Sequence, residues 1–369
     1  MHFNRRDLLK AGAVLTFAPT ELPTIARADV HFAPAPGTWR DYQVTTHLEI
    51  AKPAGISRAW IPLPSVNQKE WIKSGDSQWT TNGKAATSSD RSYGAKMLHV
   101  VWTDSKETPT VEVTSRISIQ DRAVDLTKPG KPGIDLTLAD RKCNTAGSAL
   151  IPVGGIVKQT SDKITTGKRT EVDKVRAIYE WMVENTFRDA KVRGCGIGDI
   201  TSMLKTGNLG GKCADLNALF VGLVRAAGIP ARDIYGVRVA PSRFGFKSLG
   251  ANSEVVTKAQ HCRSEVFLTG YGWTAIDPAD VRKVMLEEPP TNLAIDNPKV
   301  AAARETLFGA WEGNWLAYNF AHDLALPGFS GPKVAFLMYP QGETGNTRLD
   351  CLDADNFKYM ITSKELTAA

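Results

Sequence analysis

The chain has 369 residues, of which 42% are hydrophobic and 23% are charged. This composition supplies enough apolar mass for packed cores in two or three domains, and too little charge for a disordered chain. The formal net charge of +6 is not concentrated in a Lys/Arg block, so nucleic-acid binding has little support. The five cysteines show no C-x-x-C spacing, which argues against a disulfide scaffold and a four-thiolate zinc site.

Residues 1–28 have the pattern of an export signal. Arg5 and Arg6 are followed by an uncharged run over 11–20 and by an Ala-Arg-Ala end at 26–28. This order is typical of signal peptides, and the paired arginines before Leu-Leu-Lys resemble a twin-arginine signal. The alternative is an ordinary basic N-terminal helix. No later uncharged run is long and apolar enough for a membrane span, so we expect a periplasmic or secreted mature protein that begins near Asp29.

Residues 29–135 are expected to form an N-terminal β-domain. Three runs, at 42–50, 96–102 and 110–119, alternate apolar and polar side chains and are rich in β-branched residues. Such runs indicate strands with one buried face. The turn-forming clusters between them favour a small antiparallel sandwich, and two Pro-Gly pairs at 129–133 end it.

Helical periodicity begins after Thr170. Thr170 and Asp173 resemble a capping box, and apolar residues then recur at helical spacing as far as Val183. A second helix has its apolar face from Leu216 onward and stops at Gly228.

Strand patterns return after the second helix, at 233–239, 261–268 and 273–276. Helices followed by strands predict an α+β core over 136–290. The C-terminal extension, 291–369, contains a segment rich in Trp and Asn and strand-like runs at 334–339 and 357–362.

Cys213 occupies the position expected of a nucleophile. It lies at the start of the second helix, after Gly210, Gly211 and Lys212. Unpaired backbone N–H groups and the positive end of the helix dipole favour a thiolate there, and Lys212 adds a cation. The glycines let a substrate backbone approach closely. The alternative is a buried structural thiol.

His261 and Asp277 are spaced to serve such a thiol. If residues 268–270 form a three-residue hairpin loop, His261 lies directly opposite Asp277 on one face of the sheet. The carboxylate would then orient the imidazole and leave its other nitrogen for the thiol. His47 and His99 lie on alternating strands and are interpreted as sheet-surface residues. The alternative is a lone strand-end histidine followed by an Asp-Pro turn.

Three ordered blocks of sequence resemble the bacterial transglutaminase-like superfamily. They are GKCADLNALFVGLVRAAGIPAR at 211–232, QHCRSEVFL at 260–268 and GWTAIDP at 272–278. The resemblance implies an α+β fold, with a papain/transglutaminase-like cysteine core preceded by the small antiparallel β-sandwich. WIPLP at 60–64 belongs to a β-domain that often precedes such cores.

The same resemblance implies roles for the site residues: Cys213 as nucleophile, His261 as general base and acid, and Asp277 as the orienting member. The chemistry is acyl transfer from peptide or protein amides through a thioester, without cofactor or metal. Hydrolysis is slightly favoured over amine cross-linking. The backbone N–H of Cys213 and one more donor would hold the oxyanion; Trp181 and Gly211 are the candidates, although Trp181 also fits core packing.

Other interpretations stay open. A metal site of Cys213, Cys262 and His261 lacks an evident fourth ligand, and adjacent strand residues point to opposite faces. His322 beside Asp323 is interpreted as a local turn or interface pair. The strongest rival function is that of a periplasmic binding or scaffold protein that retains the fold with little turnover.

The odd number of cysteines leaves one thiol without a partner in the chain. We expect that thiol to be Cys213. The other four form an even set whose pairing the sequence does not decide: Cys143, Cys195, Cys262 and Cys351. Asp215, close to Cys213, is expected to stabilise the helix dipole. The sequence makes no prediction about oligomeric state.

Overall fold

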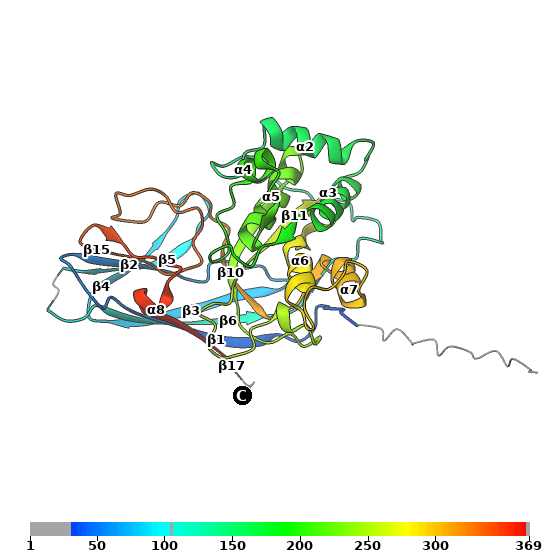
Figure 1. The fold of residues 1–369 in the computed structure, drawn as a ribbon. Coiled ribbons are helices and arrows are strands. Elements are labelled where there is room, and N and C mark those ends of the chain that lie inside the picture. The colour runs from blue at the N-terminus through cyan, green and yellow to red at the C-terminus, as the bar shows by residue number, and fades with distance from the viewer. Residues whose placement is uncertain (1–30, 104–105, 367–369) are drawn as a thin grey trace, which may run out of the picture.

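A computed structural model describes residues 31–103 and 106–366 of the chain. A β-sandwich lies beside an assembly of helices that surrounds a separate six-stranded sheet (Figure 1). The predicted export signal at 1–28 lies outside the described residues. Among the residues described, no helix is long and apolar enough to span a membrane.

The sandwich consists of two antiparallel sheets. The first has the order β17-β1-β6-β3, and the second β16-β15-β2-β5-β4. Side chains of β1 and β6 alternate between buried and partly exposed, which places one face of their sheet on the core. The strands are β1 Arg40–Glu49, β2 Ser57–Pro62, β3 Ile72–Thr81, β4 Lys84–Ser89, β5 Lys96–Trp102, β6 Thr110–Ile119, β15 Gln341–Thr344, β16 Thr347–Arg348 and β17 Tyr359–Leu366.

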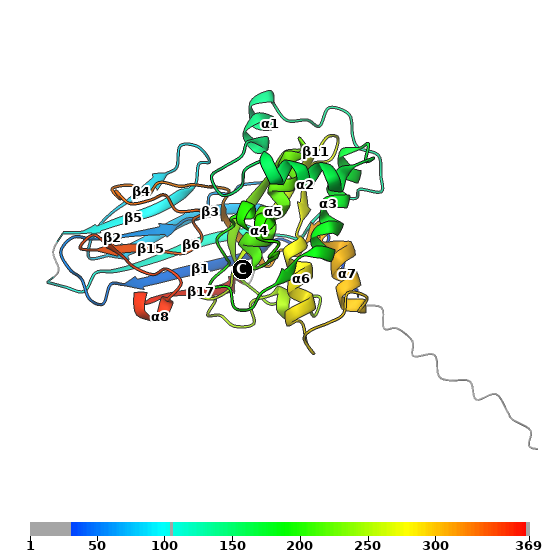
Figure 2. The same cartoon turned by 45° about the horizontal axis from the view of Figure 1, so that its top comes forward.

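The three predicted strands of this domain are confirmed as β1, β5 and β6. The C-terminal segment completes both sheets, because β17 pairs with β1 and β15 pairs with β2. Figure 2 shows β17 running beside β1 along the edge of the sandwich. The last strands of the segment 291–369 are therefore built into the two sheets of the sandwich, whereas residues 298–319 supply a helix and two strands of the α+β core.

The strand predicted at 334–339 is wrong. Val334 makes only an isolated bridge to Leu324, and regular pairing begins later, in β15. The run is apolar because Leu337 and Met338 are fully buried and Tyr339 lines a cavity. The strand predicted at 357–362 begins at Tyr359 instead, after the one-turn helix α8, Ala354–Phe357.

The α+β core is built on a six-stranded antiparallel sheet with the order β14-β10-β11-β12-β13-β7. Its strands are β7 Arg122–Ala123, β10 Ala231–Arg238, β11 Gln260–Leu268, β12 Gly272–Ile276, β13 Phe308–Trp311 and β14 Trp315–Asn319. The surrounding helices are α1 Leu138–Thr145, α2 Gly155–Thr165, α3 Glu171–Asn185, α4 Ile200–Thr206, α5 Cys213–Ala226, α6 Pro278–Glu287 and α7 Pro298–Thr306. A short 3-10 helix, Lys247–Leu249, and the parallel pair β8 Phe187–Arg188 and β9 Gly210–Gly211 complete the core.

Helix α5 is the central element of the core. Every residue of α5 is buried, and the helix packs on β10 and β11 and against α2, α3 and α6. Gly228, with φ of +82°, follows its end as predicted. The predicted cap of α3 is also confirmed, since the Thr170 side chain accepts a hydrogen bond from the backbone N–H of Asp173 at 3.0 Å.

Candidate active site

Cys213 is the first residue of α5 and lies at the wall of a cavity. Its exposed fraction is 3%, and its thiol is free. Lys212 precedes it with an extended backbone, so the helix begins at the cysteine itself. The first N–H groups of a helix have no partner within the helix and create a positive potential. The fold therefore places this thiol where a thiolate is stabilised.

Asp215 fastens a neighbouring loop to the start of α5. Its carboxylate accepts hydrogen bonds from the backbone N–H groups of Ile197 and Gly198, each at 2.9 Å, and of Lys212 at 3.0 Å. These three bonds hold the loop that carries Cys195 beside the helix. Asp215 thus has a second role besides the predicted interaction with the helix dipole.

His261 lies on β11, and a carboxylate pair surrounds one of its ring nitrogens. The Nε2 atom is 2.9 Å from Oδ2 of Asp277 and 3.3 Å from Oδ1 of Asp280. The imidazole is 3% exposed and both carboxylates are buried. The Nδ1 atom is left to face other groups, and the charge of this histidine lowers the pKa of the Cys213 thiol.

The hairpin register predicted for this pair is wrong. The structure pairs Ser264 with Ile276 and Leu268 with Gly272, so the loop is 269–271. Gly270 and Gly272 both have positive φ, which moves the turn one residue along the chain. His261 and Asp277 still meet because this shift makes them diagonal neighbours on the same face.

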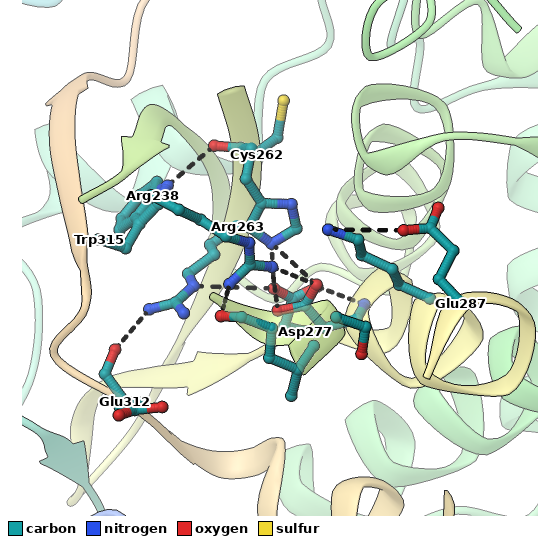
Figure 3. A network of polar contacts seen from close by, with 12 residues as sticks. Arg238, Cys262, Arg263, Asp277, Glu287, Glu312 and Trp315 are labelled. Atoms are coloured by element: carbon teal, nitrogen blue, oxygen red, sulfur yellow. Dashed lines mark hydrogen bonds and ion pairs between the residues drawn. The ribbon is translucent and has the colours of Figure 1, made fainter. Parts of the chain in front are cut away.

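A buried polar network surrounds the two carboxylates (Figure 3). Arg238 donates to both oxygens of Asp280, at 2.6 and 2.8 Å. Asp277 accepts from the amide of Asn217 at 3.2 Å and from the backbone N–H of Asp280 at 3.1 Å, as the cap of α6. The guanidinium of Arg263 lies 3.9 Å from Asp277. Each charge in this interior therefore has an opposite charge beside it.

This network raises the pKa of His261 to about 9. Burial lowers the pKa, but the negative charges of Asp280 and Asp277 raise it by more, even though the positive charge of Arg238 opposes them. The imidazole is therefore able to carry a proton at neutral pH.

The pKa of the Cys213 thiol lies well below its ordinary value. Burial raises this pKa, whereas hydrogen bonds from Cys195, Cys262 and His261 and the charge of His261 lower it by more. The pKa values of Cys195 and Cys262 are raised, so these two remain thiols beside the thiolate. The arrangement favours a thiolate and imidazolium pair.

The cavity beside the pair has a volume of about 570 Å³. Cys213 and His261 both line it, and so does Gln260, whose buried amide nitrogen has no hydrogen-bond partner among the described residues. Its other charged lining residues are mostly basic: Arg188, Lys212, Arg238, Lys258, Lys283 and Glu287. Burial lowers the pKa of Lys283 to about 8. The cavity is large enough for part of a peptide.

The structure does not bring the two oxyanion candidates to the cavity wall. Trp181 is half-buried on α3 and packs against the core instead. Gly211 also does not line the cavity; a Cβ atom there would lie 2.5 Å from the Cβ of Asp215. Its lack of a side chain therefore makes room for Asp215 and not for a substrate.

Several polar groups of the site carry no clear signal in the sequence. Asp280 follows Asp277 by three residues, which resembles only a helix start. Asn217 lies within a helix and Arg238 lies within a strand. The sequence periodicity marks both as interior polar positions but does not indicate their partners. Gln260 precedes His261 and is one residue of a strand pattern.

His322 pairs with a different carboxylate from the one beside it in sequence. Its Nδ1 is 3.1 Å from the Tyr235 hydroxyl and its Nε2 is 3.8 Å from Asp233. Asp323 instead accepts from the backbone N–H of Ala149 at 3.2 Å, with φ of +50°. Of the two histidines interpreted as sheet-surface residues, His47 is exposed, while His99 is half-buried and stacks on Trp60.

Two groups of buried side chains in the described part of the chain have donor atoms close enough to hold a metal ion. One is His261 with Asp277 and Asp280, whose carboxylates already bind the imidazole and Arg238. The other is Cys195, Cys213 and Cys262, whose ligand atoms lie within 4.8 Å of one another. The metal set considered from sequence, with His261 among the thiols, does not form; Cys195 takes its place.

Comparisons with known proteins identify the family and support the fold. The profile of the transglutaminase-like superfamily matches residues 158–278, a range that contains all three of Cys213, His261 and Asp277. An uncharacterized protein of Haemophilus influenzae is 33% identical, and the match covers 97% of this chain and 98% of that protein.

Among solved structures, a candidate cysteine protease of Cytophaga hutchinsonii is similar over 90% of this chain and 93% of its own, with a TM-score of 0.56 and 13% identity. At that identity the match shows the fold. The periplasmic domain of TgpA from Pseudomonas aeruginosa covers 62% of this chain and 90% of its own, at 16% identity, with a TM-score of 0.35, which is too low to carry an argument. The predicted fold class, an α+β protein with a transglutaminase-like core, is confirmed, and the chain belongs to the transglutaminase-like superfamily.

Proposed function

We propose that the protein is a thiol enzyme that cleaves or transfers acyl groups of peptide or protein amides. One observation carries this proposal: a cysteine at a helix N-terminus and a histidine line one cavity, and a carboxylate lies 2.9 Å from the Nε2 atom of that histidine. A nucleophile, a base and an orienting group in this order are the requirements of covalent acyl transfer.

In the proposed reaction, the proton of the Cys213 thiol has already passed to His261, and the thiolate sulfur of Cys213 attacks the amide carbonyl carbon. The C–N bond then breaks, and the amine leaves with the proton that His261 returns. Water, or a second amine, attacks the resulting thioester while His261 takes its proton. The C–S bond breaks and the thiol is restored. Asp277 holds the imidazole in orientation throughout.

The oxyanion of the tetrahedral intermediate needs donors that are already in place. The backbone N–H of Cys213, at the first position of α5, is one. We assign the second to the side chain of Gln260, because this residue borders the cavity and its amide nitrogen is buried and lacks a partner in the described part of the chain. Catalysis would supply the hydrogen bond that this group lacks in the free protein.

The site of action is part of the proposal. Residues 1–28 have the composition of an export signal, so we place the enzyme in the periplasm or outside the cell. Peptides and proteins are the substrates proposed there. Hydrolysis is favoured over cross-linking, and the cavity itself accommodates either water or an amine as the second nucleophile.

Incubation with peptide pools and a labelled primary amine tests the proposal. Purified protein is compared with the Cys213→Ala variant, and the products are analysed by mass spectrometry. New peptide termini that depend on the cysteine support a hydrolase, and amine incorporation supports a transferase. If wild-type protein yields neither, the rival function of an exported binding or scaffold protein is favoured.

A further inference from the structure

Three thiols from separate parts of the chain meet behind the proposed nucleophile. Cys195 comes from the loop before α4, Cys213 from α5 and Cys262 from β11, and their sulfur atoms lie within 4.8 Å of one another. All three are free and buried, with exposed fractions of 5%, 3% and 0%. The proposed acyl transfer uses only one of them, so the other two need another explanation.

A fourth sulfur atom adjoins the cluster. The Sδ atom of Met338 lies 3.8 Å from the sulfur of Cys262, and the methionine is fully buried. Because His261 and Cys262 are adjacent on β11, their side chains leave opposite faces of the strand. Figure 3 shows the Cys262 sulfur directed away from Asp277. The cluster therefore lies apart from the carboxylates; the backbone carbonyl oxygen of Gln260 contacts it and accepts a hydrogen bond from the Cys195 thiol at 3.4 Å.

The spacing of these atoms is close to that of a metal site. Metal–sulfur bonds of about 2.3 Å in tetrahedral geometry place neighbouring sulfur atoms about 3.8 Å apart. Cys262 and Met338 already have this separation, and the three thiols need to close by at most about 1 Å from 4.8 Å.

The kind of metal follows from the ligands. Thiolate and thioether sulfur together select soft cations, of which Cu(I) is the one that accepts methionine readily. An ion also has a route to the cluster, because Cys195 and Cys213 line the cavity of about 570 Å³. Cys262 and Met338 lie behind them and do not border the cavity.

We propose that Cys195, Cys213 and Cys262, with Met338, form a binding site for Cu(I). Cys195 and Cys262 each lose a proton to the solvent as their S–Cu bonds form, Cys213 binds as the thiolate, and no electron is transferred. Occupancy would block the sulfur of Cys213 reversibly. The metal site stands on the sulfur geometry; only the block of activity rests on the proposed function.

Titration of the reduced full-length protein with Cu(I), in competition with the chromophoric chelator bicinchoninate and without oxygen, tests the site. We expect one Cu(I) per chain and, by X-ray absorption, a shell of sulfur only. Failure to compete with the chelator, or a nitrogen and oxygen shell, overturns the proposal. So does stoichiometric binding of Zn(II) in the absence of Cu(I) binding.

Single substitutions locate the bound ion. Cys195→Ser and Cys262→Ser should each weaken Cu(I) binding at least about tenfold, and Met338→Leu should weaken it measurably. The matched control is Cys143→Ser, because Cys143 is an exposed thiol outside the cluster. Equal affinity in all these variants refutes the site. Circular dichroism of the metal-free proteins shows which variants fold. If a variant does not fold, the titration of the wild-type protein decides whether the site exists.

Inhibition is measured separately, on whichever activity the peptide assay finds. Stoichiometric Cu(I) should abolish that activity, and excess chelator should restore it. Full activity with Cu(I) bound overturns the proposed block. If the protein has no activity, the binding and absorption measurements still decide the metal site, so failure of the proposed function is distinguishable from failure of this one.

Discussion

Asp233 is a buried carboxyl group that lacks hydrogen bonds. It lies on β10 with 1% exposure, and neither carboxylate oxygen has a hydrogen-bond partner among the described residues. The Nε2 atom of His322 lies 3.8 Å from its carboxylate. Burial raises the pKa of Asp233 to about 7, against the opposing charge of Arg225, and the charges of Cys213 and Asp277 add to the rise. We predict that Asp233→Asn stabilises the protein at alkaline pH.

The magnitude follows from the shift in pKa. A carboxyl group with a pKa near 3.8 when unfolded and about 7 when folded has moved by about 3 units, and each unit corresponds to about 1.4 kcal/mol. Between these two pH values the folded state keeps a proton that the unfolded state releases, so stability falls as pH rises through that window. Asparagine resembles the protonated form and avoids this loss, which amounts to about 4 kcal/mol above pH 7.

Urea unfolding followed by circular dichroism measures the effect. At about pH 4 the variant and the wild type should have similar free energies of unfolding, and by about pH 8 the variant should be more stable. The contribution of His322 is present in both proteins and largely cancels. Asp162→Asn, at an exposed carboxylate of α2, is the matched control and should show no such divergence. A variant that is less stable than wild type at pH 8 would refute the reasoning, since it would mean that Asp233 is ionised and paired with His322.

Three further predictions concern the site. Iodoacetamide at about pH 7 should modify Cys213 ahead of the other thiols, and His261→Ala should slow this modification at least about tenfold; equal labelling by mass spectrometry in both proteins would contradict the activated thiol. Gln260→Ala should lower kcat about a hundredfold with little change in melting temperature, and an unchanged kcat would remove it from the oxyanion site. Gly196→Ala should unfold at much lower temperature than Gly207→Ala. Both glycines have positive φ, but only at Gly196 would a Cβ atom strike the carboxylate that fastens its loop, at 1.8 Å. Equal melting temperatures in the two variants would mean that backbone strain alone accounts for the loss of stability.

Within the sandwich, strands with one buried face were predictable, and the others were not. Alternation identified β1, β5 and β6, because the sequence of each records which side meets the core. Strand β2 is buried on both faces at its end, and β3 and β4 are polar and largely exposed, so none of the three alternates. Their positions depend on pairing with distant strands, which local sequence does not record.

The contact of His261 with Asp277 was predictable even though the register was wrong. A register error by an even number of residues leaves both side chains on the same face of the sheet. The side-chain contact is then still predicted correctly, although the backbone pairing is not. Cys195 had no such support. It lies in a loop between glycines, and tertiary contacts bring it to the thiol: Asp215 holds the loop, and the Cys195 carbonyl accepts a hydrogen bond from the backbone N–H of Ala214 at 2.9 Å.

Strand β11 divides the site into two chemical environments. On one face, His261 meets carboxylates and the guanidinium that neutralises them. From the other face, Cys262 enters the sulfur cluster. Cys213 interacts with both, because it starts the helix that packs across this strand. Substitution of Cys262 therefore alters the sulfur environment of the nucleophile while the hydrogen bond between His261 and Asp277 stays in place. If Cu(I) no longer inhibits the Cys262→Ser variant while His261 still transfers protons in it, a single strand keeps the two chemistries separate.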